Sequence, residues 1–188
     1  MNINDSIDLA LLNISKRNYS EALKELMSLN IEGNLISNLY IGIIYERGLG
    51  VAIDRHKAVQ FYSAAAKLGN LTAQRHLADL LRKMGRNSEA FNWYEVAAEA
   101  GSASACYWLY VMYRDGLGVP ANQMKAKEFL ERSSSFGHLY AKRDLAKSDI
   151  RGERGFIGIF KGLWSYIHTP FVLFAALRND SQSDDIHS

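Results

Sequence analysis

The chain has 188 residues, of which 48% are hydrophobic and 22% are charged, and its formal net charge is +2. This composition is typical of one globular domain, excludes an intrinsically disordered chain and gives no electrostatic reason to expect nucleic acid as a partner. The single cysteine, Cys106, excludes an internal disulfide. The acidic N-terminus, with no unbroken apolar run behind it, does not resemble a secretory signal, so we expect the cytoplasm.

Four alanines mark an internal repeat along most of the chain. Each is followed by a glycine after eleven residues, a small residue after fifteen and a large aliphatic after nineteen. The alanines are Ala22, Ala58, Ala90 and Ala126; the glycines are Gly33, Gly69, Gly101 and Gly137; the small residues are Ser37, Ala73, Ala105 and Ala141; the aliphatics are Ile41, Leu77, Leu109 and Leu145. Such self-similarity is typical of repeat architectures, whose units must stack to bury their apolar faces.

Each unit is predicted to contain two helices, A and B. In the clearest unit, apolar residues recur at helical spacing over residues 71–84 for helix A and 88–100 for helix B. Asp54 and Ser88 are predicted N-caps, and Gly69, Gly101 and Gly137 are predicted to end helix B in a left-handed conformation. Because the pattern begins near Asn4, we expect an all-α, right-handed solenoid of about four and a half helix pairs.

The loop after helix A carries the most specific motif. Residues 45–51, Tyr-Glu-Arg-Gly-Leu-Gly-Val, recur at 113–119 as Tyr-Arg-Asp-Gly-Leu-Gly-Val, and the first copy is followed by Asp54 and by paired alanines at 65 and 66. With these residues, the segment from about 4 to 155 resembles the Sel1-like repeat family, a relative of the tetratricopeptide repeat. The resemblance implies a protein–protein scaffold and no shared catalytic residues.

The C-terminal part departs from the repeat, so we divide the chain into a solenoid at 1–155, an apolar segment at 156–178 and a polar tail at 179–188. The apolar segment follows a basic stretch and is either a cap on the last repeat or a contact with lipid or a membrane protein. The residues predicted to make that contact are Phe156, Phe160, Leu163, Trp164, Ile167, Phe171 and Phe174.

We find no hydrolase, nucleotide-binding or metalloprotease motif, and no histidine at metal-ligand spacing. We therefore expect no enzyme, no cofactor and no metal site. By the offsets of the resembled family, helix A should line a concave groove, and its candidate partner-binding residues are Arg75, Asp79, Arg82, Tyr107, Arg114, Arg143 and Lys147.

A basic groove would suit an acidic peptide or a chain-terminal carboxylate. The alternatives are a solvated helix face without a partner, and a site for an anionic glycan or nucleotide. At the level of function, the first hypothesis is a cytoplasmic adaptor. The second is an accessory subunit at the inner face of a membrane, which would recruit or stabilise a membrane enzyme or transporter through the C-terminal segment.

Overall fold

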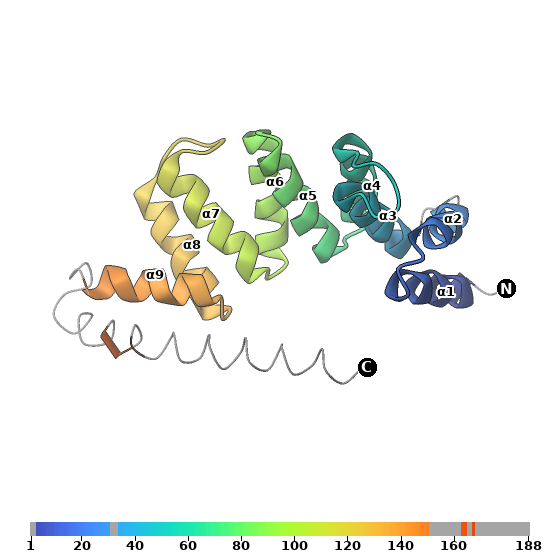
Figure 1. Cartoon of the computed structure of the whole chain (residues 1–188). Helices are drawn as coiled ribbons and strands as arrows, with labels where there is room; N and C mark the ends of the chain where they lie inside the picture. The colour runs from blue at the N-terminus through green and yellow to red at the C-terminus, as the bar shows by residue number, and fades with distance from the viewer. Residues whose placement is uncertain (1–2, 31–33, 151–162, 165–166, 168–188) are drawn as a thin grey trace. The chain divides into compact units, whose positions relative to one another are not determined.

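The computed structural model describes residues 3–30, 34–150, 163, 164 and 167. Over these ranges it contains nine α-helices and no strand (Figure 1). The chain forms two compact units, residues 1–100 with α1 to α6 and residues 101–188 with α7 to α9. The helices are α1 (Ile3–Ser15), α2 (Tyr19–Asn30), α3 (Leu35–Arg47), α4 (Arg55–Lys67), α5 (Leu71–Lys83), α6 (Asn87–Glu99), α7 (Ala103–Asp115), α8 (Gln123–Ser135) and α9 (Leu139–Ile150).

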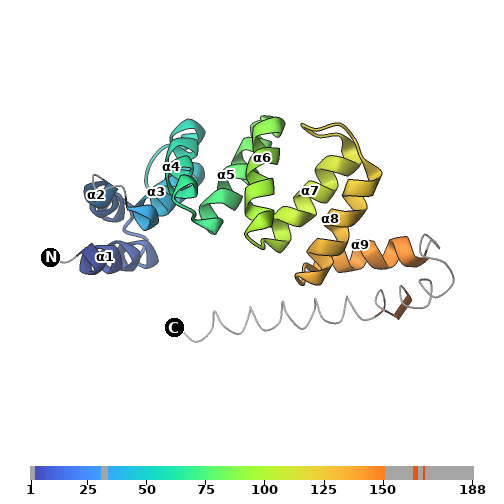
Figure 2. The same ribbon diagram turned by 180° about the vertical axis from the view of Figure 1, so that it is seen from behind.

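The helices come in pairs, as the repeat predicts. Helices α1 and α2, α3 and α4, α5 and α6, and α7 and α8 pack against each other and lie side by side in both views (Figures 1 and 2). Every helix B begins three residues before its marker alanine, and every following helix A begins thirteen residues after it. The predicted all-α class, with four pairs and a ninth helix, is confirmed within the described residues.

The helix ends follow from the same register. Asn34, Asn70 and Ser102, each immediately before a helix A, accept hydrogen bonds from backbone amides of the first turn. The glycines at 69, 101 and 137 have φ of 85°, 89° and 90°, so the predicted left-handed ends are confirmed.

The two predicted N-caps of helix B have different outcomes. The carboxylate of Asp54 accepts from the amide of Lys57 at 2.9 Å, as predicted. The prediction for Ser88 is wrong, because α6 already begins at Asn87 and its N-cap, Arg86, makes no side-chain capping bond.

Small residues allow the paired helices to approach closely. The marker alanines and the alanine pairs at 65–66 and 97–98 are buried, as the pattern predicts. Tyr62 and Tyr94 are the largest fully buried side chains. A Cβ added at Gly42 would lie 2.5 Å from the ring of Tyr62, so α3 and α4 can pack only without a side chain there.

The predicted apolar segment is described at only three of its residues. Leu163, Trp164 and Ile167 are helical, with exposed fractions of 43%, 70% and 65%. The other residues predicted to contact lipid or a partner, Phe156, Phe160, Phe171 and Phe174, lie outside the described residues. None of the helices in the described ranges is long and apolar enough to span a bilayer.

Candidate functional site

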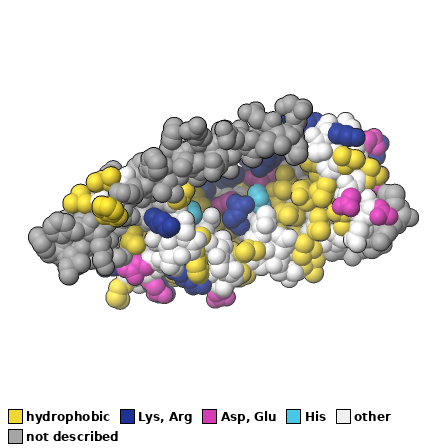
Figure 3. Space-filling model, turned by 90° about the horizontal axis from the view of Figure 1, so that it is seen from below, with side chains coloured by type: hydrophobic (Ala, Val, Ile, Leu, Met, Phe, Trp, Pro, Cys, Tyr) yellow, Lys and Arg dark blue, Asp and Glu magenta, His cyan; other side chains and the backbone are white. Residues whose placement is uncertain are grey.

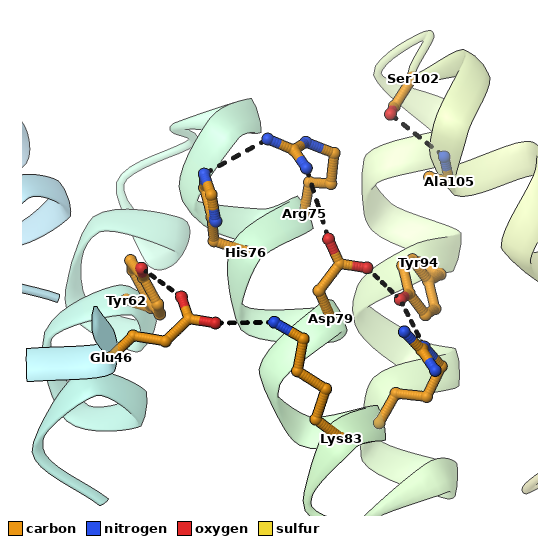
Figure 4. A network of polar contacts seen from close by, with 10 residues as sticks. Glu46, Tyr62, Arg75, His76, Asp79, Lys83, Tyr94, Ser102 and Ala105 are labelled. Carbon is orange, nitrogen blue, oxygen red and sulfur yellow. Dashed lines mark hydrogen bonds and ion pairs between the residues drawn. The ribbon is translucent and has the colours of Figure 1, made fainter. Parts of the chain in front are cut away.

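In the first unit, a half-buried carboxylate contacts two further helices (Figure 4). Glu46 on α3 accepts from the hydroxyl of Tyr62 on α4 at 2.8 Å and from the ammonium of Lys83 on α5 at 2.9 Å. Burial acts to raise the pKa of Glu46, but the hydrogen bonds from Lys83 and Tyr62 outweigh it and lower the pKa. The same contact with Glu46, together with burial, raises the pKa of Tyr62.

A second carboxylate in this unit, that of Asp79, lies among the predicted groove residues. Asp79 accepts from the hydroxyl of Tyr94 at 2.5 Å and pairs with the guanidinium of Arg75 at 3.3 Å. Arg82 Nε in turn donates to the Tyr94 hydroxyl at 3.4 Å (Figure 4). The structure thus brings Arg75, Asp79 and Arg82 together around the hydroxyl of Tyr94.

His76 joins these two groups of contacts. Its ring stacks on Tyr62 with centroids 5.4 Å apart, and its Nε2 lies 3.3 Å from a guanidinium nitrogen of Arg75. Because a guanidinium can only donate, Nε2 must be the acceptor and the imidazole must be neutral at that nitrogen. Burial, with the nearby Arg75 charge, lowers the pKa of His76.

In the second unit, the carboxylate of Asp144 on α9 contacts three predicted groove residues. It accepts from the hydroxyl of Tyr107 at 2.9 Å and pairs with Arg143 at 3.3 Å and Lys147 at 3.9 Å. Burial, followed by the contact with Asp144, raises the pKa of Tyr107 to about 12. This hydroxyl therefore remains a hydrogen-bond donor at physiological pH.

Tyr107 is also the centre of an aromatic cluster. Its ring stacks on His138 with centroids 4.7 Å apart and contacts Tyr110 and Tyr140 at 5.6 and 6.3 Å. His138 precedes α9 and accepts from the amide of Ala141 through Nδ1 at 3.3 Å. It therefore fills the capping position that Asn34, Asn70 and Ser102 fill before the other A helices.

Arg114, the remaining predicted groove residue, is held by its neighbour. Its guanidinium makes two hydrogen bonds to the carboxylate of Asp115, at 2.7 and 2.6 Å, and lies 5.1 Å from the ring centroid of Tyr110. These bonds lower the pKa of Asp115. A bidentate pair of this kind leaves little of the Arg114 fork for a partner's anion.

A pocket of about 500 Å³ opens between α7, α8 and α9. We call it the Asp144 pocket. Its lining residues are Tyr110 and Arg114 of α7, Gln123, Ala126, Lys127 and Leu130 of α8, and Asp144, Lys147 and Ser148 of α9.

Sequence reasoning missed Glu46, Asp144 and Lys127 as members of the site. One signal was available for the first two, because the pairs Glu46–Lys83 and Tyr107–Asp144 are both 37 residues apart, which places each pair on successive A helices. On the face seen in Figure 3, acidic side chains lie beside Lys, Arg and His side chains, as these pairs require.

The chemistry of the described residues offers little for catalysis. Within the described ranges there is no group of three His, Cys, Asp or Glu side chains that could hold a metal ion. Cys106 is fully buried, and burial raises the pKa of its thiol. It therefore packs as a small apolar side chain, as predicted.

Comparison with known proteins gives concordant results. A family model described as the Sel1 repeat matches residues 36–70, 73–102 and 103–138, more than half of the chain. The crystal structure of a Sel1 repeat protein from Oxalobacter formigenes is similar with a TM-score of 0.74 and 26% identity, over 88% of this chain and 68% of that one.

Two further proteins show a more limited similarity. MamA from Desulfovibrio magneticus RS-1 has a TM-score of 0.60 at 17% identity, over 92% of this chain and 96% of that one, a likeness of fold alone. A sel1-like repeat-containing protein of Acanthamoeba polyphaga mimivirus is 36% identical over 63 residues, which are 34% of this chain and only 12% of the viral protein's length.

Proposed function

Because the chain belongs to the Sel1 repeat family, whose repeats generally mediate protein–protein interaction, we propose that it is a non-catalytic adaptor for an acidic segment of a partner protein. The binding residues are those predicted from the sequence, on α5 in the first unit and on α7 and α9 in the second. The segment is an internal acidic peptide or a chain terminus, and the adaptor acts in the cytoplasm.

One observation carries this proposal: in each unit the residues predicted for the groove include more cations than carboxylates. In the first unit Arg75 pairs with Asp79 and Lys83 pairs with Glu46, and Arg82 adds a third cation beside the Tyr94 hydroxyl. In the second unit Arg114, Arg143 and Lys147 stand against Asp115 and Asp144, again three against two. Each unit thus keeps a local positive excess although the chain as a whole is nearly neutral.

The internal carboxylates give this surface a defined geometry. A pair such as Arg75–Asp79 fixes the position of the cation, so less side-chain entropy is lost when a partner binds. The pair also weakens the binding of a single acidic residue of a partner, because that residue must compete with the carboxylate already paired with the cation. The surface therefore favours a segment with several acidic residues over a single charge.

Selection from a displayed library of random peptides tests the proposal. The full chain should enrich peptides with more Asp and Glu than the library average, and 0.5 M salt should reduce the enrichment because exposed charges are screened. A variant with Arg55→Glu, a substitution of an exposed cation on α4, is the matched control and should select the same peptides. Peptides without an acidic bias would reject the proposal.

A second candidate function rests on the three described residues of the apolar segment. Leu163, Trp164 and Ile167 are helical and expose large apolar surfaces. Exposed apolar side chains of this kind suit attachment to a membrane interface or to an apolar surface of a membrane protein.

Flotation on anionic liposomes tests this second function. The full chain should float, and replacing Trp164 and Ile167 by serine should leave it in the soluble fraction. Met124→Ser, which removes a highly exposed apolar side chain from α8, is the control and should float like the parent chain. A full chain that never floats would reject the membrane function and favour the adaptor without a membrane.

A further inference from the structure

The Asp144 pocket has an apolar floor beneath a polar rim. Ala126 and Leu130 of α8 line it and are nearly buried, with exposed fractions of 2% and 5%. Its volume of about 500 Å³ lies within the range of roughly 300–1,000 Å³ that is usual for ligand sites. A floor of this kind can cover the methylene groups of a long side chain, while the rim contacts a polar end.

The rim is positive, and its available charges are the two lysines. Three cations, Arg114, Lys127 and Lys147, and one acid, Asp144, line the pocket, which is a difference of +2. The Arg114 fork is already occupied by Asp115, and the Lys147 ammonium is 3.9 Å from Asp144, beyond hydrogen-bond length. Lys127 forms no ion pair with any residue in the described part of the chain.

The same rim distinguishes between kinds of anion. A phosphate dianion is best recognised by an open guanidinium fork, and Arg114 does not offer one. Asp144 also lines the pocket and reduces its net positive charge. A single carboxylate, which two lysine ammonium groups can bind without a guanidinium fork, fits this rim.

From these contacts we infer that the Asp144 pocket binds the side chain of one glutamate of the partner segment, with its methylene groups on Ala126 and Leu130 and its carboxylate between Lys127 and Lys147. This inference rests on the proposed function and adds to it a defined subsite. It also adds Lys127, a helix-B residue outside the predicted groove, to the binding surface.

Titration of the isotope-labelled full chain, followed by amide chemical shifts, tests the subsite with small probes. The first probe is acetyl-glycyl-glutamyl-glycine amide, which should shift amides of α7, α8 and α9 around the pocket. The glutaminyl analogue has the same size without the charge, and it should bind at least tenfold more weakly. This comparison uses the unaltered chain, so it stands even if a variant fails to fold.

Two variants localise the effect. Lys127→Gln with Lys147→Gln should weaken binding of the glutamyl probe at least tenfold while the spectrum stays dispersed. Lys142→Gln removes an exposed lysine of α9 that does not line the pocket, and it should change the affinity less than twofold.

Several outcomes would overturn the inference. Equal binding of the glutamyl and glutaminyl probes would show that the carboxylate does not contribute to binding. Unchanged binding in the double lysine variant would show that the carboxylate binds outside the pocket. Tighter binding of the phosphoseryl analogue would make the pocket a phosphate site, and tighter binding of acetyl-triglycine with its terminal carboxylate would make it a chain-terminus site.

The subsite and the adaptor function fail separately. If the displayed library yields acidic peptides but the glutamyl probe does not bind in the pocket, the subsite is wrong and the adaptor function stands. If the probe binds but no acidic peptide is selected, the adaptor function is wrong.

Discussion

At the scale of single residues, one position carries backbone strain that its counterpart avoids. Arg17 has a φ of 60°, and the residue at the same offset before the marker alanine of the α5–α6 unit is Gly85, with φ of 76°. A non-glycine residue in this left-handed region costs about 1 kcal/mol or more, because its Cβ crowds the following backbone.

Arg17→Gly should therefore raise the free energy of unfolding by about 0.5–1 kcal/mol, after subtraction of the greater entropy of glycine in the unfolded chain. Chemical denaturation measures this directly. Lys16→Gly, one residue earlier and without a positive φ, is the control and should destabilise the chain or leave it unchanged. A loss of stability in the Arg17 variant would show that the strain is not relieved.

A second residue-scale prediction concerns the alanine pairs. Ala98 has an exposed fraction of 1% where α6 packs on its partner helix, so Ala98→Leu should overpack the contact and cost about 1–3 kcal/mol. Val96→Leu on the exposed side of α6 is the matched control and should cost little. An unaltered thermal midpoint in the Ala98 variant would mean that the packing faces are wrongly assigned.

At the scale of helices, the first-turn caps form a series in which one member can titrate. Asn34, Asn70 and Ser102 cap α3, α5 and α7, and His138 takes this place before α9 through an unprotonated Nδ1. Burial between Tyr107 and Tyr140 lowers the pKa of His138, whereas the charge of Asp144 acts in the opposite direction. Protonation would remove the acceptor and so weaken the start of α9.

The direction of the pH effect follows from that lowered pKa. Below the ordinary histidine pKa of about 6.5, the unfolded chain binds a proton that the folded chain resists, so stability falls with decreasing pH. The contribution of neutral His138 to stability is fully present above the ordinary histidine pKa. It is lost progressively as the pH falls from there to the pKa of His138 in the folded chain.

His138→Asn keeps a capping oxygen without a titrating group. The fall in thermal midpoint between pH 7.5 and pH 5 should be smaller in this variant than in the parent chain, and His138→Ala should cost about 1 kcal/mol at pH 7.5 for the lost cap. His56→Asn, at an exposed histidine of α4, should retain the full pH dependence. An identical pH dependence in the His138 and His56 variants would contradict the role of His138.

The helices themselves could be predicted from the sequence, because their starts depend on local features that recur with the repeat. Marker alanines, turn glycines and small residues set the register, and tertiary packing did not override them. The cap predicted at Ser88 was misplaced because α6 begins one residue earlier, at Asn87.

The side-chain contacts could not be predicted in the same way. Whether Lys83 meets Glu46, or Asp144 meets Tyr107, depends on how successive A helices lie against each other, which composition and spacing do not determine. The sequence predicted the cations as groove residues, but it did not show that Asp79, Asp115 and Asp144 pair with them. A charge count on one helix face therefore overestimates the field that a partner meets.

At the scale of the whole molecule, the two units repeat one arrangement of charge. Each has carboxylates paired with cations, and each places a tyrosine hydroxyl on a carboxylate. We expect each unit by itself to attract an acidic segment of a partner.

The most direct test uses an acidic peptide selected by display. Its binding is measured by fluorescence anisotropy to a variant with one reversed charge in each unit. Arg75→Glu with Arg143→Glu should weaken the peptide at least tenfold while the far-ultraviolet helical signal is kept. Arg55→Glu with Lys142→Glu makes the same change in net charge at exposed positions of the two units and should bind nearly as the parent chain does. If the Arg75 and Arg143 double variant binds the peptide with unchanged affinity, the acidic segment does not bind to this surface.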